Sequence, residues 1–320
     1  MKKILITGGS GFIGTNLIEH LLKKTDAELL TFDINEPKID SHNRFWKRVD
    51  IREYEELREK IVEYKPDIVI HLAARTDLRG LTLKDYDANM TGVSNLLKAI
   101  DEAGTVQKAV FASSMYVCEP GYMPKDFEDY APHTLYGESK VETERRIKKA
   151  NPSYTWSIIR PPSIWGPWFG APYDKFFHIV MKRMYFHKGK KACKKTYGYV
   201  DNAIYQIESI LKAESEKVNR NVYYLGDYEA YSITDWANEI ANIEGIKIPH
   251  VPYFCFRWMG YVGDCLKKIG IAFPMTSFRL HNMTTNNVHN LEPIKSIAPH
   301  LPVSRVEGTK VTLDWIHKYQ

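Results

Sequence analysis

Residues 7–14 read TGGSGFIG, and they stand between an apolar run, residues 3–6, and an amphipathic stretch that ends near Lys24. This order predicts a strand, a glycine turn and a helix. Glycines in such a turn let the backbone come close to a dinucleotide pyrophosphate, and the N–H groups at the helix start point at the anion. The spacing is GxxGxxG rather than GxGxxG. Because a strand and a helix flank it, the motif predicts a bound nucleotide.

The composition is that of an ordinary globular protein. The chain has 320 residues, of which 44% are hydrophobic and 26% charged, enough for one large domain or two modest ones. A net charge of +5 is mild and gives no argument for a nucleic-acid partner. The four cysteines have no metal-binding spacing, which predicts no metal site and a cytoplasmic location. The first predicted strand starts at Lys3, so we expect no signal peptide.

The most apolar late segment runs from Val251 to Pro274 and is interrupted by charged residues, Arg257, Asp264, Lys267 and Lys268. Its uninterrupted apolar runs are too short to span a bilayer. We therefore expect a buried helix here and no membrane partner. A helix lying in a membrane interface is the open alternative.

Short β-rich runs alternate with helical patterns through the first half of the chain. The predicted strands are Lys3–Thr7, Leu29–Asp33, Ile68–Leu72, Lys108–Ser113 and Ser157–Arg160. The predicted helices are Gly11–Lys23, Tyr54–Tyr64, Tyr86–Glu102 and Tyr136–Lys149. This alternation predicts an α/β fold, a Rossmann-type doubly wound parallel sheet with its ligand crevice at the carboxyl ends of the strands.

The pattern becomes less regular after Arg160, where Pro161-Pro162 and Gly166-Pro167 mark loops. A further strand is predicted over Val218–Leu225 and a helix over Thr234–Asn242. We expect a nucleotide-binding domain made of residues 1–164 plus about 199–225. A smaller, mainly C-terminal substrate lobe would contain residues 165–198 and 226–320.

An acidic residue closes the predicted second strand. Asp33 lies 25 positions beyond Gly8. A carboxylate there accepts hydrogen bonds from an adenosine ribose and repels a 2′-phosphate, which favours NAD over NADP. The alternative is a turn cap within Asp33-Ile34-Asn35.

Three residues suggest acid–base chemistry. Tyr136 and Lys140 are four residues apart and share one face of a predicted helix. A free tyrosine, with a pKa of about 10, is a poor base at neutral pH. A neighbouring ammonium and a nicotinamide ring would both favour the phenolate. Ser114 follows a predicted buried strand, where its hydroxyl can reach the same substrate oxygen, and a plain turn-forming role is the alternative.

Nine motifs follow one another along the chain: residues 7–14, Asp33, Asp50-Ile51, His71–Ala74, Asn89 with Gly92, Ser113-Ser114, Tyr136–Lys140, Arg160-Pro161 and Tyr199–Asn202. In these motifs the chain resembles, over nearly its whole length, the extended short-chain dehydrogenases/reductases. The resemblance is strongest to their NAD-dependent sugar epimerase/dehydratase group. It is specific for the family and not for a substrate.

The resemblance implies roles for individual residues. Tyr136 would be the acid/base, Ser114 would hydrogen-bond the reacting oxygen, and Lys140 would bind the nicotinamide ribose and lower the pKa of the tyrosine. Asp50 and Ile51 would flank the adenine. The expected cofactor is NAD, and its expected contacts are Gly8, Gly11, Phe12, Ile13, Gly14, Asp33, Ile34, Asp50, Ile51, Leu72, Ala73, Ala74, Asn89, Ser113, Tyr136, Lys140 and Pro161. The expected substrate contacts are Thr76, Met115, Tyr116, Ser163 and Lys195. Asn89 would also hold the structure around the site.

The chemistry that the resemblance implies is hydride transfer at a secondary alcohol. Our leading hypothesis is an NAD-dependent epimerase of a nucleotide-activated sugar, working through a keto intermediate that remains in the site. Sugar 4,6-dehydratases of the family carry an Asp-Glu pair after the hydroxyl residue, whereas this chain has Met115-Tyr116, which disfavours dehydration. A cofactor-binding protein without catalysis is disfavoured by the intact catalytic set.

Two positions leave a second enzyme class open. Nucleotide-sugar enzymes often have Asn at the position of Ser163, and they favour an arginine at the position of Lys195. Lysine keeps the charge of arginine but lacks its bidentate fork. A dehydrogenase or ketoreductase of a sugar, sterol or related alcohol, as in the 3β-hydroxysteroid dehydrogenase-like branch, is therefore the alternative.

Members of the family commonly dimerise through the helices predicted here at Tyr86–Glu102 and Tyr136–Lys149, so we expect a homodimer. Apolar residues available for this contact, or for packing on the sheet, are Val93, Leu96, Leu97, Val141 and Ile147. In the second lobe, Trp168, Phe169 and Tyr173 are candidates to stack on a base or to cover an apolar ligand, with core packing as the alternative.

Overall fold

A seven-stranded sheet forms the centre of the protein. The computed structural model describes residues 1–320 except 172, 189–192, 272, 274–275, 278–279 and 281–283. The strand order is β11-β6-β5-β4-β1-β2-β3, and neighbouring strands are paired in parallel. The strands are β1 (Lys3–Thr7), β2 (Glu28–Asp33), β3 (Trp46–Arg48), β4 (Ile68–His71), β5 (Lys108–Ala112), β6 (Thr155–Arg160) and β11 (Asn221–Tyr224). β2 and β3 lie on one side of β1, and β4, β5, β6 and β11 lie on the other. This strand order confirms the predicted doubly wound, Rossmann-type sheet.

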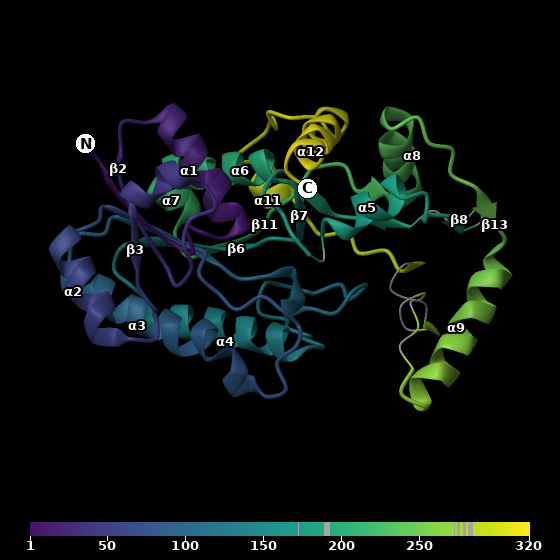
Figure 1. The fold of residues 1–320 in the computed structure, drawn as a ribbon. Coiled ribbons are helices and arrows are strands. Elements are labelled where there is room, and N and C mark those ends of the chain that lie inside the picture. The colour runs from purple at the N-terminus through teal and green to yellow at the C-terminus, as the bar shows by residue number, and fades with distance from the viewer. Residues whose placement is uncertain (172, 189–192, 272, 274–275, 278–279, 281–283) are drawn as a thin grey trace.

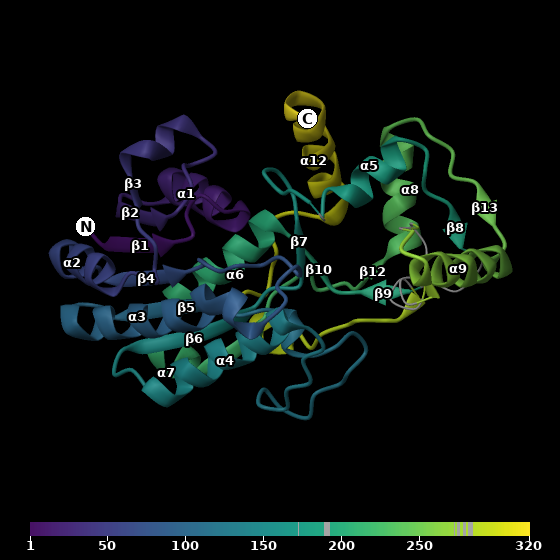
Figure 2. The ribbon, with the colours of Figure 1, turned by 60° about the horizontal axis from the view of Figure 1, so that its bottom comes forward.

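Helices cover both faces of this sheet (Figures 1 and 2). One face carries α1 (Phe12–Lys24), α6 (Val200–Lys212) and α12 (Arg305–Tyr319); the other carries α2 (Tyr54–Tyr64), α3 (Asp87–Ala103) and α4 (Leu135–Ala150). The strands between them are apolar on both sides, as a sheet covered twice requires. A separate cluster of buried apolar side chains lies on each face.

The remaining elements are short, apart from two helices. They are the helices α5 (Lys175–Met181), α7 (Ser215–Val218), α8 (Ile233–Ile243), α9 (Tyr253–Lys268) and α11 (Glu292–Lys295), and the 3-10 turns η1 (Asp40–Arg44), η2 (Leu83–Tyr86) and η3 (Met115–Val117). Three two-stranded sheets pair β10 (Tyr197–Tyr199) with β7 (Ser163–Trp165), β12 (Tyr231–Ser232) with β9 (Lys194–Lys195), and β13 (His250–Val251) with β8 (His187–Lys188). No helix among the described residues is long and apolar enough to cross a membrane.

An aromatic cluster fills the space between these elements and the sheet. Trp165 lies at its centre, with ring centroids 4.9 Å from those of Tyr199 and Trp236. Phe169 is buried in the same cluster, which decides for core packing and against a ligand-stacking role. Trp168 packs on Trp315 and Tyr319 of α12. Tyr173 is the one of the three candidate aromatic residues that is exposed.

Two predictions about the part of the chain after Arg160 are wrong. The strand predicted over Val218–Leu225 is only Asn221–Tyr224, because Arg220 turns the chain with a positive φ and Val218 ends α7. The helix predicted to be buried within 251–274 is α9, whose aromatic side chains are largely exposed. Apolar residues occupy more than one side of α9, and packing covers only the side with Phe256 and two glycines.

The apolar residues proposed for a dimer contact are also accounted for within one chain. All five of them (Val93, Leu96, Leu97, Val141 and Ile147) are buried in the clusters beneath α3 and α4. They therefore give no support to a subunit interface. The homodimer stays a prediction from the resemblance.

The glycine turn brings three backbone segments into close contact. Gly8 has a φ of +79°, and a Cβ atom at this position would lie 2.6 Å from the amide nitrogen of Ala73. A Cβ atom at Gly14 would lie 2.2 Å from the carbonyl oxygen of Gly8. Only glycine permits α1 to start so close to the end of β1. The motif therefore serves the packing of this edge as well as any ligand.

A buried ion pair fastens α4 to the sheet. Arg160 of β6 and Glu144 of α4 are completely buried, with two guanidinium–carboxylate hydrogen bonds of 2.8 Å. The guanidinium carbon of Arg160 also lies 5.3–5.6 Å from the ring centroids of Phe127, Tyr130 and Tyr224. Two buried charges are tolerated only when each satisfies the other with good geometry.

Replacing Gly14 by alanine should destabilise the fold, because the new methyl group must displace backbone atoms. We expect a loss of about 1–3 kcal/mol in the free energy of unfolding, measured with urea. Gly170→Ala is the matched control, since a Cβ atom there meets no atom within 4 Å. Equal stability of the two variants would contradict the tight contact between α1 and the turn.

Breaking the buried pair from one side should cost more than removing it. Arg160→Met leaves the Glu144 carboxylate buried and unpaired, so we expect a loss of about 3–5 kcal/mol. The double variant Arg160→Met/Glu144→Leu should recover part of this loss. Arg145→Met, which removes an exposed pair with Glu142, should cost less than about 1 kcal/mol. Additive losses in the double-mutant cycle would show that the two buried charges do not interact.

Candidate active site

Four parallel strands deliver chain segments to one edge of the sheet. β1 ends at the glycine turn, β2 at Asp33, β4 at His71 and β5 just before Ser113-Ser114. Because the carboxyl ends of parallel strands share one edge, these segments meet there. α4 begins at the same edge, where the Thr134 hydroxyl accepts a hydrogen bond from the Gly137 amide and caps the helix.

Ser114 and Tyr136 are brought together at this edge. Both are almost completely buried. The Ser114 hydroxyl accepts a 3.2 Å hydrogen bond from the Tyr116 amide and is near enough to the Tyr136 phenol to lower its pKa. The ring of Tyr136 lies between two other tyrosines, with centroids 5.8 Å from Tyr116 and 6.1 Å from Tyr86. Burial raises the pKa of the Tyr136 phenol, and the Ser114 hydroxyl opposes this only in part. The neutral phenol is therefore the favoured form.

Lys140 lies one helical turn after Tyr136 and is also buried. Its Nζ donates a 2.8 Å hydrogen bond to the carbonyl oxygen of Ala112, at the end of β5. Burial lowers the pKa of Lys140 to about 8, and the Glu144 carboxylate on the next turn opposes this shift. The protonated form of Lys140 is thus less favoured than that of an exposed lysine. Burial is the largest influence on the pKa of Tyr136, and the lowering of this pKa by Lys140 stays a prediction.

A buried histidine lies behind this pair. His71 accepts or donates a 2.6 Å hydrogen bond between its Nδ1 and the Thr7 hydroxyl. Burial, together with the charge of Lys140, lowers the pKa of His71 to about 3, so the ring is neutral. The Thr7 hydroxyl also contacts the Ala73 amide at 3.4 Å. His71 therefore joins β1 to β4 beneath the site and is not a proton donor at neutral pH.

The glycine turn and Asp33 fit a dinucleotide. A Cβ atom on Gly11 would meet only the Gly8 carbonyl, at 3.2 Å, so the outer side of the turn is open to a phosphate. The Asp33 carboxylate accepts hydrogen bonds from the amides of Ser10, at 3.1 Å, and Asn35, at 3.0 Å. Both interpretations of Asp33 thus hold geometrically: it caps its own turn and it lies beside the glycine motif, where a ribose would be bound.

Other predicted cofactor residues line the same edge. Leu72, Ala73 and Ala74 follow β4 and are half-buried. The Ser113 amide donates to the Ile159 carbonyl at 2.7 Å, while its buried hydroxyl has no hydrogen-bond partner among the described residues. A buried, unpaired hydroxyl at the mouth of such a site is suited to a ligand. Phe12 and Ile13 start α1, Ile34 is exposed beside Asp33, and Pro161 follows β6.

Three predicted cofactor residues have contacts within the protein. The Asp50 carboxylate is paired with Arg52, which lowers the pKa of Asp50. Ile51 is buried against Gly92. The Asn89 side chain exchanges hydrogen bonds of 2.8 and 3.0 Å with the backbone of Arg75 and donates to Ser139 at 2.9 Å. This arrangement supports a structural role for Asn89, and its contact with the cofactor stays a prediction.

The predicted substrate residues lie on several elements. Met115 and Tyr116 form η3 directly after Ser114, and Thr76 is exposed in the loop after β4. Ser163 belongs to β7 and Lys195 to β9. Burial lowers the pKa of Lys195. Met115 and Tyr116 are next to the catalytic set, whereas the contacts of the other three with a substrate remain predictions.

Several side chains around Tyr136 were not predicted from the sequence. His133 stacks on Tyr116 with ring centroids 5.6 Å apart. The amide of Asn287, far along the chain, contacts the Met115 sulfur at 3.8 Å. Glu144 could have been found, because it follows Lys140 by one helical turn. Asn287 could not, because only the folded chain brings residues 115 and 287 together.

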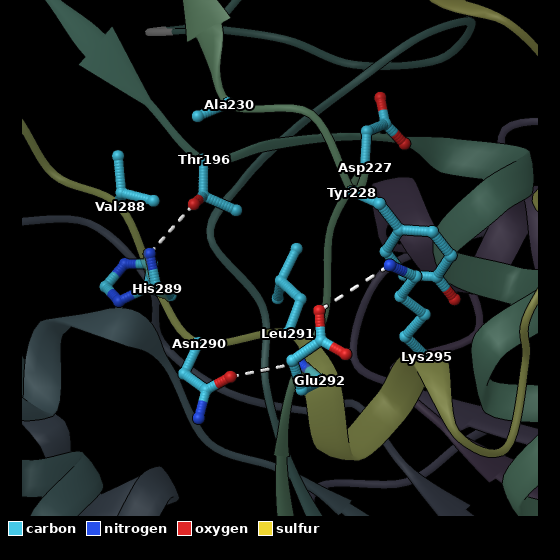
Figure 3. A pocket seen from close by; sticks show the side chains of 10 residues that line it. All are labelled: Thr196, Asp227, Tyr228, Ala230, Val288, His289, Asn290, Leu291, Glu292 and Lys295. Carbon is cyan, nitrogen blue, oxygen red and sulfur yellow. Dashed lines mark hydrogen bonds and ion pairs between the residues drawn. The ribbon is translucent and has the colours of Figure 1, made fainter.

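Figure 3 shows a separate pocket. It is lined by Thr196, Asp227, Tyr228, Ala230, Val288, His289, Asn290, Leu291, Glu292 and Lys295. Its polar groups are largely used within the protein: the His289 amide donates to Thr196 at 2.9 Å, and Lys295 pairs with Glu292 at 3.6 Å. The His289 ring stacks on Tyr224, 4.4 Å away, next to Arg160. None of the predicted site residues lines this pocket.

Comparisons with known proteins agree with this geometry. Residues 4–226 match the NAD dependent epimerase/dehydratase family. A 3-beta-hydroxysteroid dehydrogenase of Mycolicibacterium neoaurum is 28% identical over 271 residues, covering 78% of this chain and 72% of the relative. An N-acetyl-alpha-D-glucosaminyl-diphospho-ditrans,octacis-undecaprenol 4-epimerase of Escherichia coli O157:H7 is 27% identical over 326 residues, covering 98% and 94%.

The fold is also that of a solved epimerase. The crystal structure of a UDP-glucuronic acid 4-epimerase from Bacillus cereus in complex with NAD has a TM-score of 0.76 at 21% identity, and the likeness covers 99% of this chain and 97% of that one. The family match covers more than half of the chain and includes the glycine turn, Ser114, Tyr136 and Lys140. The chain is thus an NAD-dependent enzyme of the epimerase/dehydratase family, within the extended short-chain dehydrogenases/reductases.

Proposed function

We propose that the chain is an NAD-dependent epimerase of a nucleotide-activated sugar. The observation that carries the proposal is the meeting of Ser114, Tyr136 and Lys140 beside an open glycine turn at one edge of the sheet. Members of the family depend on NAD. The open glycine turn and the Asp33 carboxylate beside it are suited to hold this cofactor. The substrate is a small molecule, and we expect the protein to act in the cytoplasm.

The proposed chemistry divides between the cofactor and the chain. NAD, when bound, supplies the hydride acceptor and donor. Tyr136 takes the proton of a secondary hydroxyl, and Ser114 hydrogen-bonds the oxygen as it becomes a carbonyl. The keto intermediate then presents its other face, and Tyr136 returns the proton to the opposite epimer. The side chain after Ser114 is Met115, which cannot transfer a proton, so elimination of water has no dedicated acid or base.

The substrate panel covers more than one activating group. The name of the E. coli relative describes a sugar whose diphosphate is carried by a polyprenol. We propose that Lys195 binds the diphosphate and that Thr76, Met115, Tyr116 and Ser163 contact the sugar. The assay should therefore test a lipid-linked sugar diphosphate as well as UDP-, GDP- and dTDP-sugars.

A dehydrogenase or ketoreductase is the second candidate. The M. neoaurum relative is named for such an activity, and Ser163 and Lys195 depart from the pattern of nucleotide-sugar enzymes. The two candidates differ in the fate of the hydride. An epimerase shows new sugar epimers by chromatography without build-up of NADH, whereas a dehydrogenase accumulates one NADH for each ketone released.

Replacing Tyr136 by phenylalanine should lower turnover by about 10²–10⁴-fold, because general acid–base catalysis is lost. NAD binding, measured by calorimetry, should be kept, since the glycine turn is untouched. Tyr319→Phe, on an exposed ring of α12, is the matched control and should be fully active. Near-normal turnover in the Tyr136 variant would remove this residue as the acid/base.

The weakly held charge of Lys140 predicts a pH dependence of stability in protein stripped of NAD. The pKa falls from the ordinary 10.5 to about 8 in the folded chain, so the unfolded chain binds more protons between these values. The free energy of unfolding should therefore rise with pH through this window, by about 2 kcal/mol between about pH 7 and about pH 9.5. Lys140→Met should lack this rise. The same rise in both proteins would show that Lys140 is not the group that titrates.

A further inference from the structure

Helix α9 presents an apolar stripe to solvent. Phe254, Trp258 and Tyr261 are 63%, 70% and 54% exposed, and with Val262 they follow the i, i+4, i+7, i+8 spacing of one helical face. Ile269, directly after the helix, is 69% exposed. Large aromatic side chains are seldom exposed together on a surface that contacts only water.

The opposite side of α9 is the one that packs. Phe256, Gly260 and Gly263 are its buried residues. A Cβ atom on Gly260 would lie 3.3 Å from Ser277, whose amide donates to Asp264 at 3.2 Å. These contacts fix the orientation of the helix. The aromatic stripe therefore faces outward as a consequence of how α9 is held.

Cations border the aromatic stripe. Arg257 is exposed and donates to the Tyr261 hydroxyl at 3.3 Å, and Lys268, in the last turn of the helix, lies on the side of the stripe. Lys267 follows the spacing of Phe256, Gly260 and Gly263 and belongs to the packed side. The single acidic residue of the helix, Asp264, is turned to Ser277 on the packed side. The outward surface thus combines aromatic side chains with positive charge. This composition is typical of helices that lie in the interface of an anionic membrane.

The position of α9 leaves this surface free to approach a flat partner. Both ribbon views place it at the end of the molecule remote from the N-terminus and from the helices that cover the sheet (Figures 1 and 2). α9 is too short and too charged to span a bilayer. A helix of this kind lies parallel to the membrane, with its aromatic side chains at the level of the headgroups.

We propose that the outward face of α9 docks the protein onto an anionic lipid bilayer. Phe254, Trp258, Tyr261 and Ile269 enter the interface, and Arg257 and Lys268 contact lipid phosphates. Neither set acts alone: the apolar contacts provide most of the binding and the cations select for anionic lipid. The proposal does not depend on which reaction the active site performs.

Vesicle sedimentation tests this docking directly. The full chain with NAD is mixed with vesicles of phosphatidylcholine alone or with about one third phosphatidylglycerol, the range in which surface charge matters. We expect binding to the anionic vesicles that weakens with added salt. Trp258→Ser should reduce the partition coefficient about tenfold or more. Arg257→Gln and Lys268→Gln should each reduce it about fivefold on anionic vesicles only.

Val306→Ser is the matched control, since Val306 is exposed on α12, away from α9, and its loss should leave partition unchanged. Melting temperatures and turnover of a water-soluble substrate should be the same in all these variants. Absence of vesicle binding, or equal binding by the wild type and Trp258→Ser, would overturn the proposal. So would self-association that Trp258→Ser abolishes without any vesicle binding, because α9 would then contact a second copy of the chain.

Discussion

The attachment of α4 to the sheet is the constraint on which the active site depends. Glu144 binds Arg160 of β6 in a fully buried ion pair, and Ser139 accepts a hydrogen bond from Asn89 of α3. Because unpaired buried polar groups are costly, each of these bonds has essentially one acceptable geometry. The helix that carries Tyr136 and Lys140 is thus held against the sheet at β6, next to β5, the strand that Ser113 and Ser114 follow. The contacts that hold α4 in the fold therefore also set the positions of Tyr136 and Lys140.

Burial gives this site an unusual electrostatic balance. It raises the pKa of the Tyr136 phenol and lowers that of Lys140 to about 8, so both side chains are driven towards their neutral forms. Neutral groups are cheap to bury but poor at moving protons. The positive charge of a nicotinamide would favour the phenolate, so proton transfer becomes easy only when cofactor and substrate are in place. His71 and Thr7 complete a neutral, hydrogen-bonded floor for this arrangement.

Much of the fold was predictable, because it rests on local patterns. The glycine turn at residues 7–14, the alternation of strands and helices, and the four-residue spacing of Tyr136 and Lys140 are all readable along the chain. The features that could not be predicted from the sequence depend on contacts between distant segments of the chain. Nothing near Asn89 in the sequence indicates that its amide is used up by Arg75 and Ser139. Burial of a helix is equally non-local: α9 is apolar enough to be buried, but only one of its sides finds a partner in the described chain.

We expect Tyr136 and Lys140 to face the nicotinamide of a bound NAD at the carboxyl edge of the sheet. A crystal structure of the protein with NAD measures this directly. We predict the pyrophosphate over Gly11, the adenosine ribose on the Asp33 carboxylate, and the nicotinamide ring beside the Tyr136 hydroxyl, with the Lys140 ammonium on its ribose. A nicotinamide that lies away from Tyr136, or a dinucleotide bound elsewhere than at the glycine turn, would contradict the account.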